Sequence, residues 1–168
     1  MMIPFFRHPA VWVIAAALST GAAPGAAAQN FNTAPTQVVS ANPFGIMLEI
    51  FNAEYEHTAG ESFTIGVGGS IFTSDNDQYR SLDAFWRFYP EPTPSSFQGW
   101  SFGLKAGITA IDQNTYLGAG FDVDRSWLLG KNQNFYVGIG LGLKRLFGHD
   151  AGLKFVPTIR LVNIGYAF

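Results

Sequence analysis

The stretch 159-IRLVNIGYAF-168 carries the clearest strand pattern in this sequence. Val162, Ile164, Tyr166 and Phe168 are apolar and occupy every second position, which is the period of a β-strand with one apolar face. The ends of a chain are usually its least ordered parts. A strand pattern that continues to a final aromatic residue therefore suggests that this segment completes a sheet.

The same alternation recurs along most of the chain. It is clearest in the stretches 62-SFTIGVGGSIF-72, 100-WSFGLKAGITA-110, 115-TYLGAGFDV-123 and 135-FYVGIGLGL-143. In each of them one face is apolar, and the other consists of glycine, hydroxyl and charged residues. No segment shows the period of an amphipathic helix. The pattern predicts an all-β protein.

Seven strands follow from the alternation, and an even number is expected for a single-chain bacterial barrel. We therefore assign a short eighth strand near 36–43, where Pro43 and Gly45 could turn the chain. The other expected strands span 46–57, 62–73, 79–89, 98–111, 114–128, 134–147 and 154–168.

The composition bears on which face points inward. Charged residues make up 13% of the chain, aromatic residues make up 15%, and there are 19 glycines. This is about half the usual share of charge for a soluble domain. Glycine makes a poor water-facing surface, but it suits a narrow lumen surrounded by apolar residues that face lipid. We predict an eight-stranded antiparallel up-and-down transmembrane β-barrel, with a soluble periplasmic lipocalin-like binding barrel as the alternative.

The first residues have the features of a cleaved signal peptide. Arg7 provides a positive charge, residues 11–18 form a short apolar core, and Ala26 and Ala28 fit a small-residue cleavage site. We expect residues 1–28 to be the signal peptide and residues 29–168 to form the barrel in the cell outer membrane. The chain has no cysteine, which excludes disulfides, thiolate metal sites and a lipoprotein anchor.

Aromatic residues gather around the expected connections, as in the girdles of membrane barrels. The parity of the strands places the connections near 57–62, 90–96 and 129–134 in the periplasm, together with the C-terminus. The expected periplasmic girdle contains Trp86, Phe88, Tyr89, Phe97, Trp100, Trp127, Phe135, Tyr136, Tyr166 and Phe168. The expected outer girdle contains Phe72, Tyr79, Tyr116, Phe147 and Phe155.

Three stretches in this order, 53-AEYEHTAGESFTIGVGGSIF-72, 85-FWRFYP-90 and 163-NIGYAF-168, resemble a family of small outer-membrane β-barrel proteins of uncharacterised function, in the OmpA-type barrel superfamily. The resemblance covers most of the expected barrel and implies a fold and a location, but no catalytic residues. It also implies that Ile164, Tyr166 and Phe168 form a C-terminal signal for the barrel-assembly machinery.

The phase of the strands places several ionisable residues in the lumen. They are Glu54, Glu56, Asp83, Arg87, Lys105, Asp122, Asp124 and Lys144. Because buried charges must be paired or hydrated, we expect an internal network of ion pairs, with a proton or ion path as the alternative. Arg80, Arg145 and Arg160 share the phase of the lipid-facing residues, and we consider them candidate lipopolysaccharide contacts.

A non-enzymatic role is expected, either structural or in binding a small ligand or lipid. The alternative is an outer-membrane lipid A-modifying enzyme, which would use Ser, His and a carboxylate. After the expected signal peptide the chain has two histidines, His57 and His149. We expect them on opposite sides of the membrane, and neither has a serine nearby in the sequence. No cofactor or metal site is expected. Acidic residues outnumber basic ones 12 to 10, which argues against nucleic acid as a partner. We expect a monomer surrounded by outer-membrane lipid.

Overall fold

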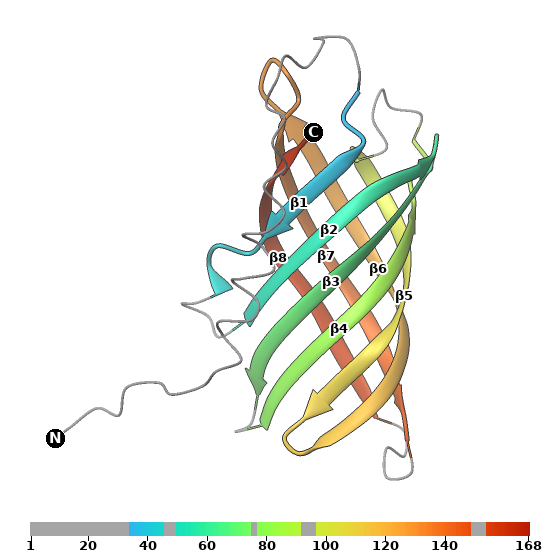
Figure 1. Cartoon of the computed structure of the whole chain (residues 1–168), viewed down its shortest axis with the longest axis vertical. Helices are drawn as coiled ribbons and strands as arrows, with labels where there is room; N and C mark the ends of the chain where they lie inside the picture. Colours follow the sequence, from blue (N-terminus) through green and yellow to red (C-terminus); the bar gives the residue numbers. More distant parts are fainter. Residues whose placement is uncertain (1–33, 46–49, 75–76, 92–96, 149–153) are drawn as a thin grey trace, which may run out of the picture. The chain divides into compact units, whose positions relative to one another are not determined.

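The structure is a computed structural model, and it describes residues 34–45, 50–74, 77–91, 97–148 and 154–168 (Figure 1). The expected signal peptide, residues 1–28, lies outside the described residues. His149 also lies outside them.

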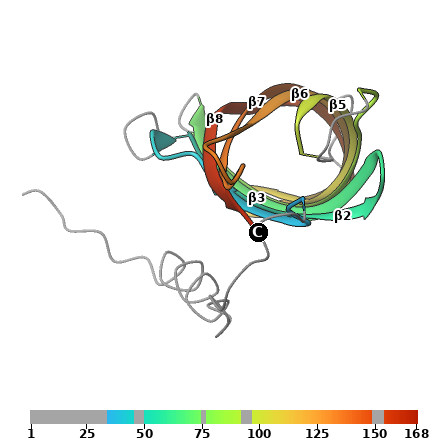
Figure 2. The ribbon, with the colours of Figure 1, turned by 90° about the horizontal axis from the view of Figure 1, so that it is seen from above.

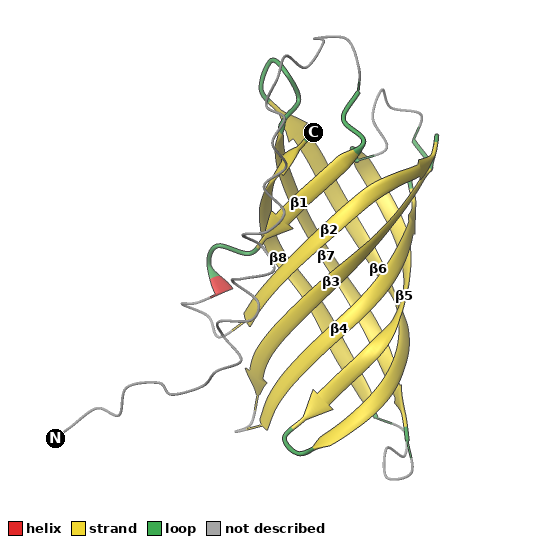
Figure 3. Ribbon diagram, viewed as in Figure 1, coloured by secondary structure: helices red, strands yellow, loops and turns green. Residues whose placement is uncertain are grey.

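The β-strands of the described chain form one closed ring (Figures 1 and 3). Each strand pairs in antiparallel fashion with its neighbours in sequence, and β1 pairs with β8. The eight antiparallel strands of the prediction are confirmed. They are β1 (Gln37–Ala41), β2 (Ile50–Gly60), β3 (Phe63–Ser74), β4 (Asp77–Phe88), β5 (Gly99–Ile111), β6 (Asn114–Leu129), β7 (Phe135–Phe147) and β8 (Phe155–Ala167).

The last strand closes the ring against the first. Val38 pairs with Ala167, and Ala41 pairs with Ile164. The backbone nitrogen of Gln37 also donates to the carbonyl oxygen of Phe168 at 2.9 Å, and the nitrogen of Phe168 donates to the oxygen of Gln37 at 2.9 Å. The alternation in the final residues therefore belongs to the strand that joins the two ends of the sheet.

The two faces of the sheet have the predicted orientation. Leu104, Leu117 and Leu141 point outward and are between 60% and 66% exposed. The face that carries glycine and charged residues points into the ring. Figure 2 shows the ring along its axis. At Gly120 the strands approach so closely that a Cβ atom would lie 2.2 Å from the carbonyl oxygen of Leu143 on β7. Glycine is therefore required there by the close approach of backbones.

Six aromatic residues of the expected girdles lie inside the ring instead. Tyr136 is fully buried between Phe135 and Val137, which face outward. Because neighbouring residues of a strand point to opposite faces, two consecutive aromatics cannot both belong to a girdle. The girdle prediction was thus wrong for Tyr89, Phe97 and Tyr136 at one end of the ring, and for Phe72, Tyr79 and Tyr116 at the other.

A β-bulge reverses the phase of β8. Gly138 pairs with Asn163 and Gly140 pairs with Arg160, so that β8 has one residue more than β7 between these pairs. The extra residue lies within the apolar pair Leu161 and Val162. Because a bulge shifts the alternation by one position, the residues before it change face.

The wall has an uneven seam, because β1 has five residues whereas its neighbours β2 and β8 have 11 and 13. Pairing between β1 and β8 ends at Ile164, and residues 155–163 have no strand partner on that side within the described chain. The Asn52 side chain of β2 spans the gap and donates to the carbonyl oxygen of Ile159 at 3.3 Å. Backbone groups alternate between the two edges of a strand, so the nitrogen of Pro157 faces the same gap. Proline suits this position because it has no N–H to leave unpaired.

Candidate functional site

A layer of charged side chains lies in the middle of the lumen. It contains four cations, Arg87, Lys105, Lys144 and Arg160. They face five carboxylates, Glu54, Glu56, Asp83, Asp122 and Asp124. All eight ionisable residues that the sequence assigned to the lumen are in this layer, and Arg160 joins them. We call this set the lumen network.

Arg87 on β4 is the centre of the lumen network. Its guanidinium lies 2.8 Å from Glu56 and 3.2 Å from Glu54, both on β2, and 2.9 Å from Asp124 on β6. The group also lies over the ring of Phe85, 4.0 Å from its centroid. Arg87 is 1% exposed, so these interactions replace its hydration almost completely. The planar guanidinium group has five N–H donors, so one arginine can bind carboxylates from two other strands.

Two hydroxyl groups complete the surroundings of Glu56. The Tyr89 hydroxyl donates to its carboxylate at 3.0 Å, and the Thr64 hydroxyl donates to the same oxygen. Tyr89 lies just beyond the end of β4, and its burial raises the pKa of the hydroxyl well above the usual value. Tyr89 therefore remains a neutral donor to Glu56. These contacts give the carboxylate partners other than water, as a buried charge requires.

The two lysines make separate pairs. Lys105 on β5 lies 2.7 Å from Asp122 on β6. Lys144 on β7 pairs with Asp83 on β4 and donates to the hydroxyls of Ser81 and Thr109, each at 2.8 Å. The pair between Lys144 and Asp83 therefore connects β7 to β4, which are not neighbours in the sheet.

Arg160 corrects one of the sequence predictions. We expected it on the lipid-facing side as a lipopolysaccharide contact, but it is buried in the lumen, 2.9 Å from Glu54. It also donates to the Tyr136 hydroxyl at 2.8 Å. The bulge in β8 is the reason, because it reverses the phase on which the expectation depended. The signal in the sequence was the doublet of apolar residues, Leu161 and Val162, which interrupts strict alternation.

The other two candidate lipopolysaccharide contacts lie outside the ring. Arg80 on β4 and Arg145 on β7 are exposed, and both are near the end of the ring where β3 turns into β4. The Arg145 guanidinium lies over the ring of Phe147, 5.3 Å from its centroid. The three residues of the expected assembly signal, Ile164, Tyr166 and Phe168, alternate on the outer side at the opposite end of the ring.

Buried apolar side chains lie in the lumen on both sides of the charged layer. One buried cluster lies near the end of the ring where β1 begins and β8 ends. It consists of Val38, Phe97, Leu128, Tyr136 and Ala167. Near the other end a second cluster consists of Ile111, Tyr116, Leu146 and Val156, with Phe72 and Tyr79 packed against it. The charged layer therefore lies between two buried apolar clusters.

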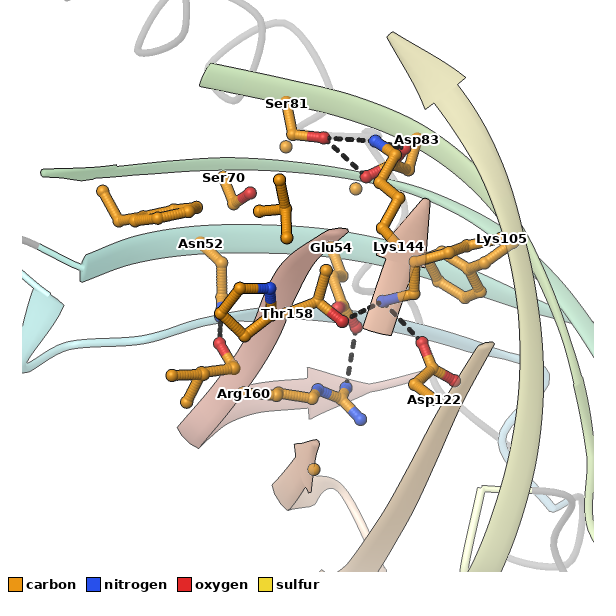
Figure 4. A pocket seen from close by; sticks show the side chains of 18 of the residues that line it. Asn52, Glu54, Ser70, Ser81, Asp83, Lys105, Asp122, Lys144, Thr158 and Arg160 are labelled. Atoms are coloured by element: carbon orange, nitrogen blue, oxygen red, sulfur yellow. Dashed lines mark hydrogen bonds and ion pairs between the residues drawn. The ribbon is translucent and has the colours of Figure 1, made fainter. Parts of the chain in front are cut away.

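A cavity of about 90 Å³ lies in the lumen and is lined in part by the charged layer (Figure 4). Asn52 and Ser70 line it from β2 and β3, and Thr158 and Arg160 line it from β8. The hydroxyl of Thr158 accepts a hydrogen bond from Lys105 at 3.3 Å. A volume of this size holds a few water molecules or one small group, and is well below the roughly 300 Å³ of a typical ligand pocket.

No histidine among the described residues lies in the lumen network. Their one histidine, His57, lies on the outer face of β2, whereas Glu56 and the hydroxyls of the network point inward. No group of three or more metal-ligating side chains is placed to hold a metal ion within the described part of the chain. No helix among these residues is long and apolar enough to cross a membrane.

Comparison of the chain with protein-family models, curated proteins and solved structures finds no match. The functional interpretation therefore depends on the geometry of the ring and its lumen.

Proposed function

We propose that this chain is a non-enzymatic β-barrel of the Gram-negative outer membrane. In this proposal residues 1–28 direct export and are removed, and residues 29–168 insert as a monomer with the help of the barrel-assembly machinery. The barrel serves the envelope as a rigid structural element that is surrounded by lipid.

The observation that carries the proposal is the distribution of polarity. Aliphatic side chains cover the outside of the ring, and the charged residues of the lumen network are enclosed. In water this arrangement would expose apolar surface and bury charge, and both are unfavourable. In hydrocarbon the same surface is solvated, and the ladders between the strands pair most of their backbone groups within the ring. The soluble lipocalin-like alternative needs the opposite orientation of the two faces.

An outward-facing arginine supports a membrane boundary near one end of the ring. Arg125 on β6 lies over the rings of Trp100 and Trp127, 5.3 Å and 5.8 Å from their centroids. It also lies 3.5 Å from Glu91, beyond the end of β4. Indole rings and snorkelling arginines favour the region between hydrocarbon and water. This group is suited to the level of the lipid headgroups.

The buried side chains of the lumen argue against a pore. Eight strands enclose space for side chains and not for an aqueous channel. In this ring the charged layer lies between two apolar clusters. The ion pairs connect β2, β4, β5, β6, β7 and β8, and this supports a stabilising role for them rather than ion conduction.

Cell fractionation with a gel-shift assay tests the proposal. The protein expressed with its leader should pellet with outer membranes, and its N-terminus should begin at Gln29. Unboiled samples should migrate differently from boiled ones, because a closed barrel resists detergent until it is heated. A soluble protein whose migration does not depend on boiling would contradict the proposal. A conductance measurement in planar bilayers should show no steps.

A further inference from the structure

An apolar groove crosses the outer face of the ring over β6, β7 and β8. Its aliphatic lining consists of Val123, Ile139, Leu141, Ile159 and Leu161. Ile139 lies opposite the bulge of β8, and a bulge bends its strand, so the sheet is not flat at this point. The groove has a volume of about 420 Å³, within the range of about 300–1,000 Å³ that is typical of ligand sites. It is therefore large enough for part of an acyl chain.

Arg125 on β6 places a positive charge at the edge of this groove. It pairs in the sheet with Trp100 on β5 and with Ile139 on β7, so the three side chains form one row on the outer face. Trp100 and Arg125 both contribute to the lining of the groove. The guanidinium lies over the rings of Trp100 and Trp127, which hold it at the surface of the sheet. A cation thus adjoins an apolar surface at the level proposed for the lipid headgroups.

A carboxylate lies beside this cation without saturating it. Oε1 of Glu91 is 3.5 Å from Nη1 of Arg125, and the two side chains are 47% and 30% exposed. Among the residues that the structure describes, Glu91 is the one polar partner of Arg125. A guanidinium has five N–H donors and a carboxylate accepts several hydrogen bonds, so both groups can bind a further molecule. The site therefore offers a cation, an anion and an apolar groove next to one another.

We infer that this site binds a phospholipid whose headgroup carries both a phosphate and a primary ammonium group, such as phosphatidylethanolamine. The phosphate pairs with Arg125, the ammonium group pairs with Glu91, and an acyl chain lies in the groove. Such binding deepens the proposed function and rests on the insertion of the barrel into a membrane.

Two other phospholipid headgroups match this site less well. The quaternary ammonium of phosphatidylcholine has no N–H to donate to Glu91, and its preferred partners are the faces of aromatic rings. At this site the Arg125 guanidinium already lies over Trp100 and Trp127. The anionic headgroup of phosphatidylglycerol has no ammonium for Glu91, and its phosphate is repelled by that carboxylate.

Tryptophan fluorescence tests the inference, because bromine atoms on an acyl chain quench a tryptophan only at short range. The mature protein with Trp86→Phe reports from Trp100 and Trp127. A second protein, with Trp100→Phe and Trp127→Phe, reports from Trp86 on β4, which does not line the groove. Each is folded into phosphatidylcholine vesicles that contain the same small fraction of brominated phosphatidylethanolamine, phosphatidylcholine or phosphatidylglycerol.

The quenching should depend on the headgroup at one place only. Next to Trp100 and Trp127, phosphatidylethanolamine should be enriched about threefold over the other two lipids, as one exposed ion pair provides. Next to Trp86, the three lipids should quench equally.

Variants of the two charged residues separate their roles. Arg125→Gln should remove the enrichment, because the phosphate loses its cation. Glu91→Gln should remove the preference for phosphatidylethanolamine and produce one for phosphatidylglycerol, because the cation is then unpaired. Arg145→Gln is the control, since Arg145 is also an outward arginine over an aromatic ring, and should leave the enrichment unchanged. If Arg125→Gln does not show the gel shift, the comparison of the three lipids in the first protein decides alone.

Equal quenching by the three lipids at Trp100 and Trp127, or enrichment of either other lipid there, would overturn the inference and leave the proposed function intact. Enrichment that persists in both Arg125→Gln and Glu91→Gln would overturn it as well, because these charges would not be its cause. Quenching of no tryptophan by any brominated lipid would contradict both proposals, because the outer face would then not contact lipid.

Discussion

Arg160 on β8 and Glu54 on β2 form an ion pair of 2.9 Å across the seam of the ring. The pair joins the two strands that flank the short β1, behind the part of the wall where the ladder is interrupted. Side chains thus hold together two strands that backbone hydrogen bonds do not connect directly.

A double-mutant cycle on this pair should show strong coupling. Arg160→Met should lower the free energy of unfolding by about 3 kcal/mol, because it leaves a buried carboxylate with one partner fewer. Glu54→Gln should have a similar effect, and the double variant should lose about 1–3 kcal/mol less than the sum of the two. Urea unfolding in lipid vesicles measures all three values. Arg145→Met, on the outer face, is the control and should change stability by less than about 1 kcal/mol. Additive losses would show that the pair does not act as a unit.

Arg87 should be the most sensitive residue of the lumen network. Arg87→Met removes the cation shared by Glu54, Glu56 and Asp124, and should cost more than about 4 kcal/mol or prevent folding. Arg87→Lys should recover only part of the loss, because an ammonium group cannot hold three carboxylates as a planar fork does. The fraction of protein that shows the gel shift after refolding is the measurement. Wild-type yield from the lysine variant would mean that charge alone is required.

Gly120 should not tolerate a methyl group. Its added Cβ would lie 2.2 Å from the carbonyl oxygen of Leu143 and 2.7 Å from the Cα atom of Lys144, and both are backbone atoms. Gly120→Ala should therefore lower stability by about 1–3 kcal/mol, as overpacking does. Gly60→Ala is the matched control, because its Cβ would meet only a Phe63 ring atom at 3.7 Å. Equal effects of the two substitutions would contradict the close approach of β6 and β7.

The two outward arginines should contribute to lipopolysaccharide binding. Arg80 and Arg145 are exposed near the same end of the ring, on β4 and β7. Guanidinium groups pair with phosphate oxygens through two parallel hydrogen bonds. Replacing both with serine should reduce the amount of lipopolysaccharide that copurifies in mild detergent, with stability changed by less than about 1 kcal/mol. Unchanged copurification would remove this role.

The alternation of residues predicted the strands and most of the lumen, because one face of each strand is apolar and the other is not. It also placed Glu56, Arg87 and Asp124 on the inner face. It failed at Arg160, because alternation assumes that no residue is inserted, and the bulge at Leu161 and Val162 breaks that assumption.

The seam could not be predicted in this way either. The seam depends on where β1 ends relative to β8. The number of residues over which two distant strands pair does not produce a periodic pattern in the sequence. Pro157 was the one local indication, since proline within a strand favours an unpaired edge. The girdle prediction was wrong for six aromatic residues for a simpler reason, because it depended on their closeness to a turn and not on the face of the strand.

The depth dependence of a charge on the outer face gives a further test of membrane insertion. Leu141 and Phe147 both point outward from β7 and are 66% and 46% exposed, but Leu141 lies in the middle of the strand and Phe147 at its end. Leu141→Arg should cost about 2–4 kcal/mol in a bilayer, whereas Phe147→Arg should cost about 0–1 kcal/mol, because the penalty falls toward the interface. Urea unfolding in vesicles measures both. In a water-soluble barrel, an exposed arginine would be tolerated equally at the two positions. Equal, small effects would therefore contradict the proposed environment, whereas a large difference would place the middle of β7 in hydrocarbon.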